Sequence, residues 1–207
     1  MITRVVCISD THNNYPALPD GDILIHCGDL TARGTFNELF SALGWLQRQP
    51  HKHKILVPGN HDEGLASAYI PNSLEGINFL VDREIEVEGL RIYGSPWLSF
   101  KGWSFHREDA ELEKLYTKVP SGLDILVTHS PPLGILDSCR DGHVGLAALA
   151  VAVTRAKPKN HIFGHVHEAY GTMCGEETRF INCAWVGLTP DGKAKRPNLP
   201  FVLEIFR

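Results

Sequence analysis

The stretch Val57-Pro58-Gly59-Asn60-His61-Asp62 decides how this sequence is interpreted. It follows the run Lys54-Ile55-Leu56, which is typical of a strand, and the Pro-Gly pair then stops the strand and turns the chain. The three polar residues that follow are therefore expected on a loop at the carboxyl end of a strand. In open α/β sheets, this edge is where ligands bind.

The same arrangement recurs at four other places in the chain. Each time, an apolar run that predicts a strand ends in residues that can bind a metal: Asp10 and His12 after 5–9, Asp29 after 22–27, His129 after 124–128, and His165 and His167 after 160–163. If these strands share a sheet and a direction, their polar ends converge at one edge. Such a mixed set of oxygen and nitrogen ligands suits Mn, Fe or Zn better than Ca or Mg alone.

Two of these strand ends are predicted to supply two ligands each. Asp10 and His12, and likewise His165 and His167, are two positions apart, so in extended backbone each pair projects to one side. A dinuclear centre also needs a bridging group, and a carboxylate with its two oxygens suits that place. Asp29 is the lone acid on its loop and is the best candidate for the bridge.

The remaining pattern predicts one domain of mixed α/β type over residues 1–207, long enough to bury its own core. Helices are expected over 36–47, 63–69, 108–118 and 145–156, the first with Thr35 as N-cap and Glu38 completing a capping box. Short strands over 77–81, 84–88 and 90–93 predict an antiparallel edge or the start of a second sheet. The last two strands are expected over 179–184 and 201–206.

Charge and cysteine content narrow the class of protein further. The formal net charge of −4 argues against a nucleic acid polymer as partner. The five cysteines are scattered and form no CxxC pair, which favours a reducing compartment. The longest apolar window, 144–153, is too short to span a membrane, and the start of the chain does not resemble a signal peptide. We therefore expect a cytoplasmic protein without a membrane partner.

Five motifs together resemble the signature of the calcineurin-like metallophosphoesterases, over essentially the whole chain: Asp10-x-His12, Gly28-Asp29, Gly59-Asn60-His61-Asp62, His129 and Gly164-His165-x-His167. The chain is most similar to the short branch of metallophosphoesterase-domain-containing proteins that lack a cap domain. The resemblance implies a four-layer α/β/β/α sandwich with two mixed β-sheets, and two divalent ions as cofactors. It also implies the ligands of each ion: Asp10, His12, Asp29 and His167 for one, and Asp29, Asn60, His129 and His165 for the other.

A phosphoesterase mechanism follows from such a site. Two ions lower the pKa of a bridging water, so that hydroxide attacks phosphorus in line with the leaving oxygen. His61, which is not needed as a ligand, is predicted to stabilise or protonate the leaving group, an effect of about 10²–10⁴-fold. Asp62 is expected to hold the His61 imidazole in its charged form, or else only to cap the next helix.

The resemblance favours a phosphodiesterase that acts on small diesters such as cyclic nucleotides. Asn60, Arg33, Trp97 and Trp103 are the predicted substrate contacts. In related protein phosphatases an arginine at a similar offset clamps the phosphate, although Arg33 can equally be exposed without that role. The aromatic loop 94–107 can stack a base or can pack beneath itself as a small cluster. A phosphomonoesterase or protein phosphatase is the alternative enzyme, and a catalytically silent metal-binding scaffold is the alternative of another class.

Overall fold

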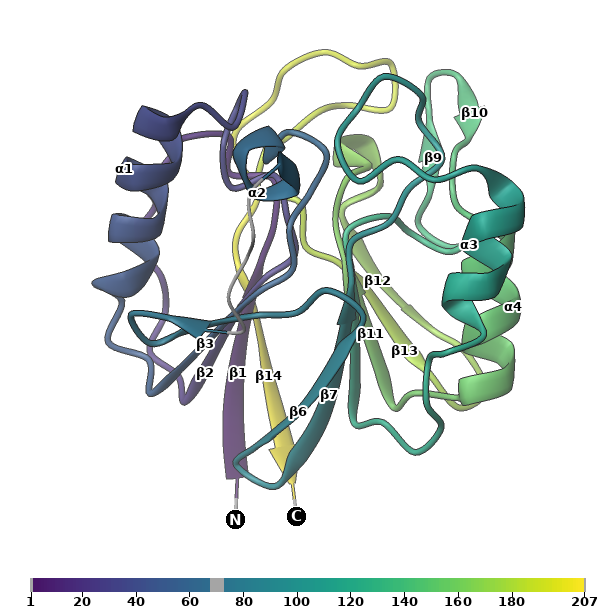
Figure 1. The fold of residues 1–207 in the computed structure, drawn as a ribbon, viewed down its shortest axis with the longest axis horizontal. Coiled ribbons are helices and arrows are strands. Elements are labelled where there is room, and N and C mark those ends of the chain that lie inside the picture. Colours follow the sequence, from purple (N-terminus) through teal and green to yellow (C-terminus); the bar gives the residue numbers. More distant parts are fainter. Residues whose placement is uncertain (1, 68–72, 207) are drawn as a thin grey trace.

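The computed structural model of the chain describes residues 2–67 and 73–206 and contains two six-stranded mixed sheets with helices on their outer faces (Figure 1). The first sheet has four parallel strands, β1 (Ile2–Ile8), β2 (Ile23–His26), β3 (His53–Leu56) and β5 (Ile77–Phe79), between two antiparallel edges, β14 (Phe201–Phe206) and β4 (Ser73–Leu74). The second has β7 (Leu90–Ser95), β8 (Ile125–Thr128), β11 (Asn160–Phe163) and β13 (Arg179–Asn182) between β6 (Arg83–Val87) and β12 (Gly171–Cys174). The predicted α/β sandwich is therefore confirmed.

Helix α1 (Phe36–Gln47) begins and ends at the predicted residues. The Thr35 hydroxyl accepts a hydrogen bond from the Glu38 amide over 3.4 Å, and the Glu38 carboxylate accepts one from the Thr35 amide over 3.1 Å, which completes the capping box. The other described helices are α2 (Glu63–Ser67), α3 (Asp109–Tyr116) and α4 (Ala147–Ala156), with a short 3₁₀ helix η1 (His167–Ala169) and a small hairpin of β9 (Ser138–Cys139) and β10 (Gly142–His143). The predicted end of α2 near Tyr69 lies outside the described residues.

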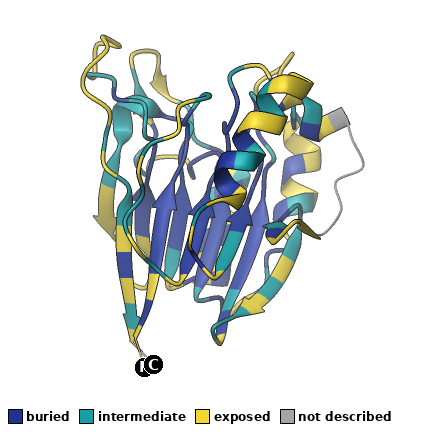
Figure 2. Cartoon of the chain, turned by 90° about the vertical axis from the view of Figure 1, so that its left-hand side faces the viewer, coloured by how far each residue is buried: buried dark blue, intermediate teal, exposed yellow. Residues whose placement is uncertain are grey.

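The central strands are apolar on both faces because both faces of each sheet are covered. Along β1, Val5 and Cys7 belong to the core between the two sheets, whereas Val6 and Ile8 belong to the core beneath α1. The second sheet repeats this pattern, with a third core that packs it against α3 and α4. Figure 2 shows the central strands buried and the outward side of the helices exposed. No helix among the described residues is long and apolar enough to cross a membrane.

The two sheets meet where β1 ends. The Ser9 amide donates to the Cys183 carbonyl over 3.0 Å, and the Cys27 amide donates to the Ile8 carbonyl over 2.9 Å, so consecutive residues of one strand contact both sheets. In Figure 1 this end of β1 lies opposite the chain termini, among the loops at the top of the view. The strand ends of both sheets can therefore deliver side chains to one shared place.

Candidate metal centre

The ligand loops leave extended geometry immediately after their strands. Asp10, His12, Asp29 and His165 all have positive φ values, of 55°, 42°, 53° and 67°. Non-glycine residues rarely adopt this left-handed conformation, and where they do it is often at a functional site. The expectation that the pairs 10/12 and 165/167 project together from extended backbone is therefore wrong in its reason, although both pairs do reach the site.

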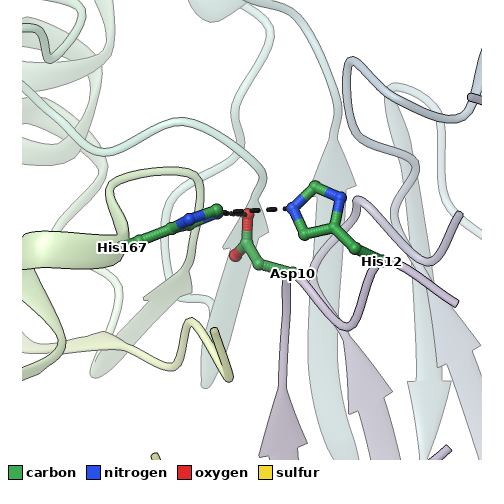
Figure 3. A group of neighbouring side chains, drawn as sticks. All are labelled: Asp10, His12 and His167. Atoms are coloured by element: carbon green, nitrogen blue, oxygen red, sulfur yellow. Dashed lines mark hydrogen bonds and ion pairs between the residues drawn. The ribbon is translucent and has the colours of Figure 1, made fainter. Parts of the chain in front are cut away.

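The first group of side chains is Asp10, His12 and His167 (Figure 3). Asp10 Oδ1 lies 3.2 Å from His167 Nε2, and His167 Nε2 lies 3.4 Å from His12 Nε2. Two imidazole nitrogens and a carboxylate oxygen therefore face one point. The Asp10 carboxylate is buried and also accepts the His165 amide, so its position is fixed by the loop that follows β11.

The second group is Asp29, His129 and His165, with Asn60 beside it. Asn60 Oδ1 lies 2.9 Å from His129 Nε2. The other nitrogen of this ring, Nδ1, lies 2.8 Å from the Cys27 carbonyl oxygen, which can only accept, so Nδ1 carries the hydrogen. That hydrogen bond fixes the ring and leaves Nε2 as the atom that can bind a metal, as is usual for metal-binding histidines.

Asp29 lies between the two groups. Its Oδ2 is 3.8 Å from His12 Nε2, and its Oδ1 is 3.4 Å from His129 Nε2. Each oxygen thus faces a histidine of a different group, which is the arrangement expected of a bridging carboxylate.

The residues of the two groups could hold metal ions. Within each group, the donor atoms lie within 4.8 Å of one another and mix imidazole nitrogen with carboxylate oxygen. Burial opposes the charged form of Asp10, but the histidines around this residue hold its pKa well below the usual range. The Asp10 carboxylate is therefore ionised and can bind a cation. Burial lowers the pKa of His129 while the charge and hydrogen bond of Asp29 raise it, to about 9 overall; a cation at Nε2 would replace that proton.

Three motif glycines are required because the ligand loops touch. A β-carbon on Gly28 would lie 2.5 Å from His129 Nδ1, one on Gly59 would overlap Asp29, and one on Gly164 would overlap Asp10 and Ser9. The glycines in the Gly-Asp, Gly-Asn-His and Gly-His motifs therefore let neighbouring loops approach closely enough for the candidate ligands to meet.

His61 is placed beside the ligand groups by two hydrogen bonds, each of which involves one backbone group. Its amide donates to Asp29 Oδ1 over 2.8 Å, and its Nδ1 donates to the Ala32 carbonyl over 2.6 Å. Since a carbonyl only accepts, Nδ1 carries a hydrogen and Nε2 is the atom left for substrate. The ring also contacts His12, with ring centroids 4.7 Å apart.

Asp62 directly precedes α2 and its backbone carbonyl accepts from the Ala66 amide over 3.3 Å, as the capping alternative predicts, but its carboxylate contacts other groups than the His61 imidazole. It accepts hydrogen bonds from the Gly59 amide over 2.9 Å and from the Thr31 amide and hydroxyl over 2.9 and 2.8 Å. It thus ties the loop after β2 to the loop after β3, and the carbonyl of Ala32 holds His61 instead. Burial, and then the charge of Asp29, raise the pKa of Asp62 to about 6 despite these donors.

The predicted substrate contacts divide into two sets. One cleft of about 620 Å³ is lined by three of these contacts, Asn60, Arg33 and Trp103, together with His61. Trp97 does not line this cleft: its indole Nε1 donates to Asp82 Oδ2 over 2.8 Å, and the Arg107 guanidinium covers its ring at 4.0 Å. Trp97 is therefore packed at the base of the aromatic loop, whereas Trp103 lines the cleft; the stacking of a base on this loop stays a prediction.

Two kinds of residue near the site were not among the predicted site residues. Phe100 lies against His165 with ring centroids 5.1 Å apart; it belongs to the aromatic loop 94–107 but was not one of the predicted substrate contacts. The buried histidines His26 and His161 hydrogen-bond Thr11 and Thr128 over 3.1 and 2.8 Å. Since both threonines directly adjoin ligands, a threonine beside a motif residue was the available signal.

Comparisons with known proteins agree with this geometry. The family model for calcineurin-like phosphoesterases matches residues 3–169. A UPF0046 protein of Caenorhabditis elegans is 40% identical over 231 residues, which cover 98% of this chain and 80% of that protein. Metallophosphoesterase domain-containing protein 1 of Homo sapiens is 37% identical, over 88% of this chain and 66% of its own length. The solved structure of TT1561 from Thermus thermophilus shares the fold, with a TM-score of 0.62 at 12% identity over 88% of this chain and 89% of that one.

Proposed function

Because the chain belongs to the calcineurin-like phosphoesterase family, we propose that it is a phosphoesterase that uses two divalent ions, Mn, Fe or Zn, to hydrolyse small phosphodiesters such as cyclic nucleotides. When bound, such ions polarise phosphoryl oxygens and activate water as the nucleophile. Asp10, His12, Asp29 and His167 would hold one ion, and Asp29, Asn60, His129 and His165 the other.

The observation that carries the proposal is the placement of His61. Its Nδ1–H is held by the Ala32 carbonyl, and its ring lies in the cleft between His12 and Trp103. The same hydrogen bond persists when the ring is protonated, and the second proton is then at Nε2. His61 can therefore pass a proton from Nε2 to the leaving-group oxygen, which is the task of a general acid.

A second candidate, a phosphomonoesterase or protein phosphatase, is favoured by Arg33. The Arg33 side chain is exposed, lines the cleft and has no hydrogen bond or ion pair with the residues that the structure describes. A guanidinium there suits the additional negative charge of a monoester. We favour diesters because the cleft beside His61 is large enough for an organic leaving group and has an aromatic wall.

The test is a comparison of initial rates. Metal-stripped protein is reconstituted with Mn²⁺ and assayed on an aryl phosphomonoester, the matching diester and a cyclic nucleotide, with His61→Asn protein as the matched control. We expect the diesters to be preferred. A preference for the monoester would favour the second candidate and give Arg33 a role. No turnover of any substrate by protein with two bound ions would favour a metal-binding scaffold instead.

The class of partner and the compartment belong to the same proposal. We propose a small phosphoester substrate rather than a nucleic acid polymer, because the net charge is −4. We also propose a cytoplasmic location, since all five cysteines are free thiols in this structure. A thiol reagent added at cell lysis, before the cysteines can oxidise, would label those that are reduced in the cell. The labelled fraction tests whether the five cysteines of the native protein are free thiols there.

A further inference from the structure

One loop contacts the metal centre on both sides. Residues 98–106 place the Trp103 ring 4.5 Å from the His61 ring and the Phe100 ring 5.1 Å from the His165 ring, measured between centroids. Both aromatic side chains are exposed, Trp103 to 47% and Phe100 to 37%, although each contacts a histidine of the site. Exposed aromatic rings grouped beside a polar site are typical of ligand-binding surfaces.

The two contacts belong to different halves of the site. His61 lies against His12, with ring centroids 4.7 Å apart, and His12 is in the first group of ligands. His165 lies against His129, with centroids 4.9 Å apart, in the second group. Trp103 therefore flanks one proposed ion position and Phe100 flanks the other.

The base of this loop is fixed although its tip is exposed. The Leu98 amide donates to the Phe105 carbonyl over 3.2 Å, and the Arg107 amide donates to the Leu98 carbonyl over 2.9 Å. The Trp97 carbonyl accepts from the Tyr116 hydroxyl over 2.9 Å, and its indole is held by Asp82. The tip of the loop thus presents two aromatic rings from a base that is held by hydrogen bonds. Because the base is already ordered, the loop loses less conformational entropy when a ligand binds.

We propose that Phe100 and Trp103 form an aromatic bracket that recognises the two organic substituents of a phosphodiester. Trp103 shares its cleft with His61, the residue assigned to the leaving group, so it contacts the leaving group and favours a flat ring there. Phe100 lies on the other side, beside His165, and contacts the substituent that remains on phosphorus. A monoester has no such substituent and a methyl diester has only a small one, so Phe100 determines the preference for diesters whose second substituent is a ring. This inference rests on the proposed function.

Three substrates that release the same leaving group separate the two roles. They are para-nitrophenyl phosphate, its methyl diester and its phenyl diester. For Phe100→Ala we expect KM to rise by about 5- to 100-fold for the phenyl diester, the range of an aromatic stacking contact, and to stay unchanged for the other two. For Trp103→Ala we expect KM to rise for all three, because the leaving group is common to them.

The controls address packing and positioning. Phe40→Ala removes an aromatic ring that is 75% exposed on α1. This variant should change neither KM nor kcat for any of the three substrates. Phe100→Leu and Trp103→Leu keep apolar volume without a flat ring and should lose most of the selectivity. Equal effects of Phe100→Ala on all three substrates, or no effect on any, would overturn the proposal. A fall in kcat alone for Trp103→Ala would show that Trp103 only positions His61.

A binding measurement does not depend on turnover. Titration calorimetry of the metal-loaded protein with diphenyl phosphate and with phenyl phosphate should show that Phe100→Ala weakens only the diester. Metal content is measured on every variant to show that the centre is intact. If the wild-type protein binds both compounds but hydrolyses no substrate, the proposed function fails and the calorimetry still decides the bracket. If Phe100→Ala weakens both compounds alike, the bracket fails whatever the activity.

Discussion

Gly59 lies so close to Asp29 that a β-carbon on residue 59 would overlap both the amide nitrogen and Oδ1 of Asp29. The loop after β3 thus packs directly on the proposed bridging carboxylate. We expect Gly59→Ala to move Asp29 and to weaken metal binding by about 10- to 100-fold, as the loss of a supporting contact does at metal sites. Metal titration of the stripped protein measures this.

Gly44→Ala is the matched control for that substitution. Gly44 lies inside α1, where an added β-carbon would meet only the end of the flexible Arg48 side chain, at 3.2 Å. Alanine should stabilise the helix by roughly 0.5–1 kcal/mol and leave metal affinity unchanged. Equal metal affinities of the two variants would contradict the assigned role of Gly59.

His61→Asn should separate chemistry from metal binding. The seven predicted ligands remain, so we expect both ions to stay bound while kcat falls by about 10²–10⁴-fold, the usual effect of losing a general acid. Metal analysis and initial rates on the same preparation provide the two readouts. His143→Asn changes an exposed histidine outside the ligand groups and should leave the rate unaltered. An unchanged rate in His61→Asn would remove His61 from the mechanism.

The position of Asp29 predicts a difference in metal stoichiometry. The two oxygens of Asp29 face His12 and His129, which belong to different groups, whereas His12 is grouped with neither His129 nor His165 among the described residues. We expect Asp29→Ala to weaken both ions and His12→Ala to weaken one, because only a bridging carboxylate contributes to both sites. Elemental analysis after dialysis counts the ions. One tightly held ion in Asp29→Ala protein would argue against the bridge.

Buried His161 should make the metal-free protein sensitive to acid. Burial lowers its pKa to about 3 in the folded chain, below the value of about 6.5 expected when the chain is unfolded. Between these values the unfolded chain binds the additional proton, so the free energy of unfolding falls as pH falls from 6.5 towards 3. The loss is about 2 kcal/mol at pH 5 for one such histidine.

Denaturant unfolding at several pH values tests this expectation. His161→Asn should reduce the dependence of the unfolding free energy on pH by about 1.4 kcal/mol per pH unit between pH 4 and 6, whatever it costs in packing. His26, whose pKa burial also lowers to about 3, provides an independent repeat as His26→Asn. An unaltered slope in both variants would mean that neither ring is kept neutral by the fold.

The positions of the strands along the chain could be predicted because their local signals agree, but local signals did not show that these strands are divided between two sheets. The parallel strands can be identified because each is an apolar run that ends in a turn and a polar motif. The start of α1 can be identified from the capping box of Thr35 and Glu38. Local backbone preference and hydrophobic burial act within a few residues of the chain, so a sequence displays them directly.

The details of the site depended on contacts between distant segments. The partner of His61 is the Ala32 carbonyl, 29 positions away, and not the adjacent Asp62. Asp62 instead joins two loops, and Trp97 is packed while Phe100 and Trp103 face the site. No local pattern encodes which of several similar side chains a folded loop turns outward.

The sequence by itself therefore determined the strands and the candidate ligands at their ends, because both rest on short-range pattern, whereas the sandwich of two sheets was implied by the family resemblance. Only the tertiary structure decided the left-handed backbone of Asp10, the orientation of His61 and the division of the aromatic loop. The physical reason is that hydrogen bonds and close packing between loops form only when both sheets have met, and their free energy selects conformations that local preference disfavours.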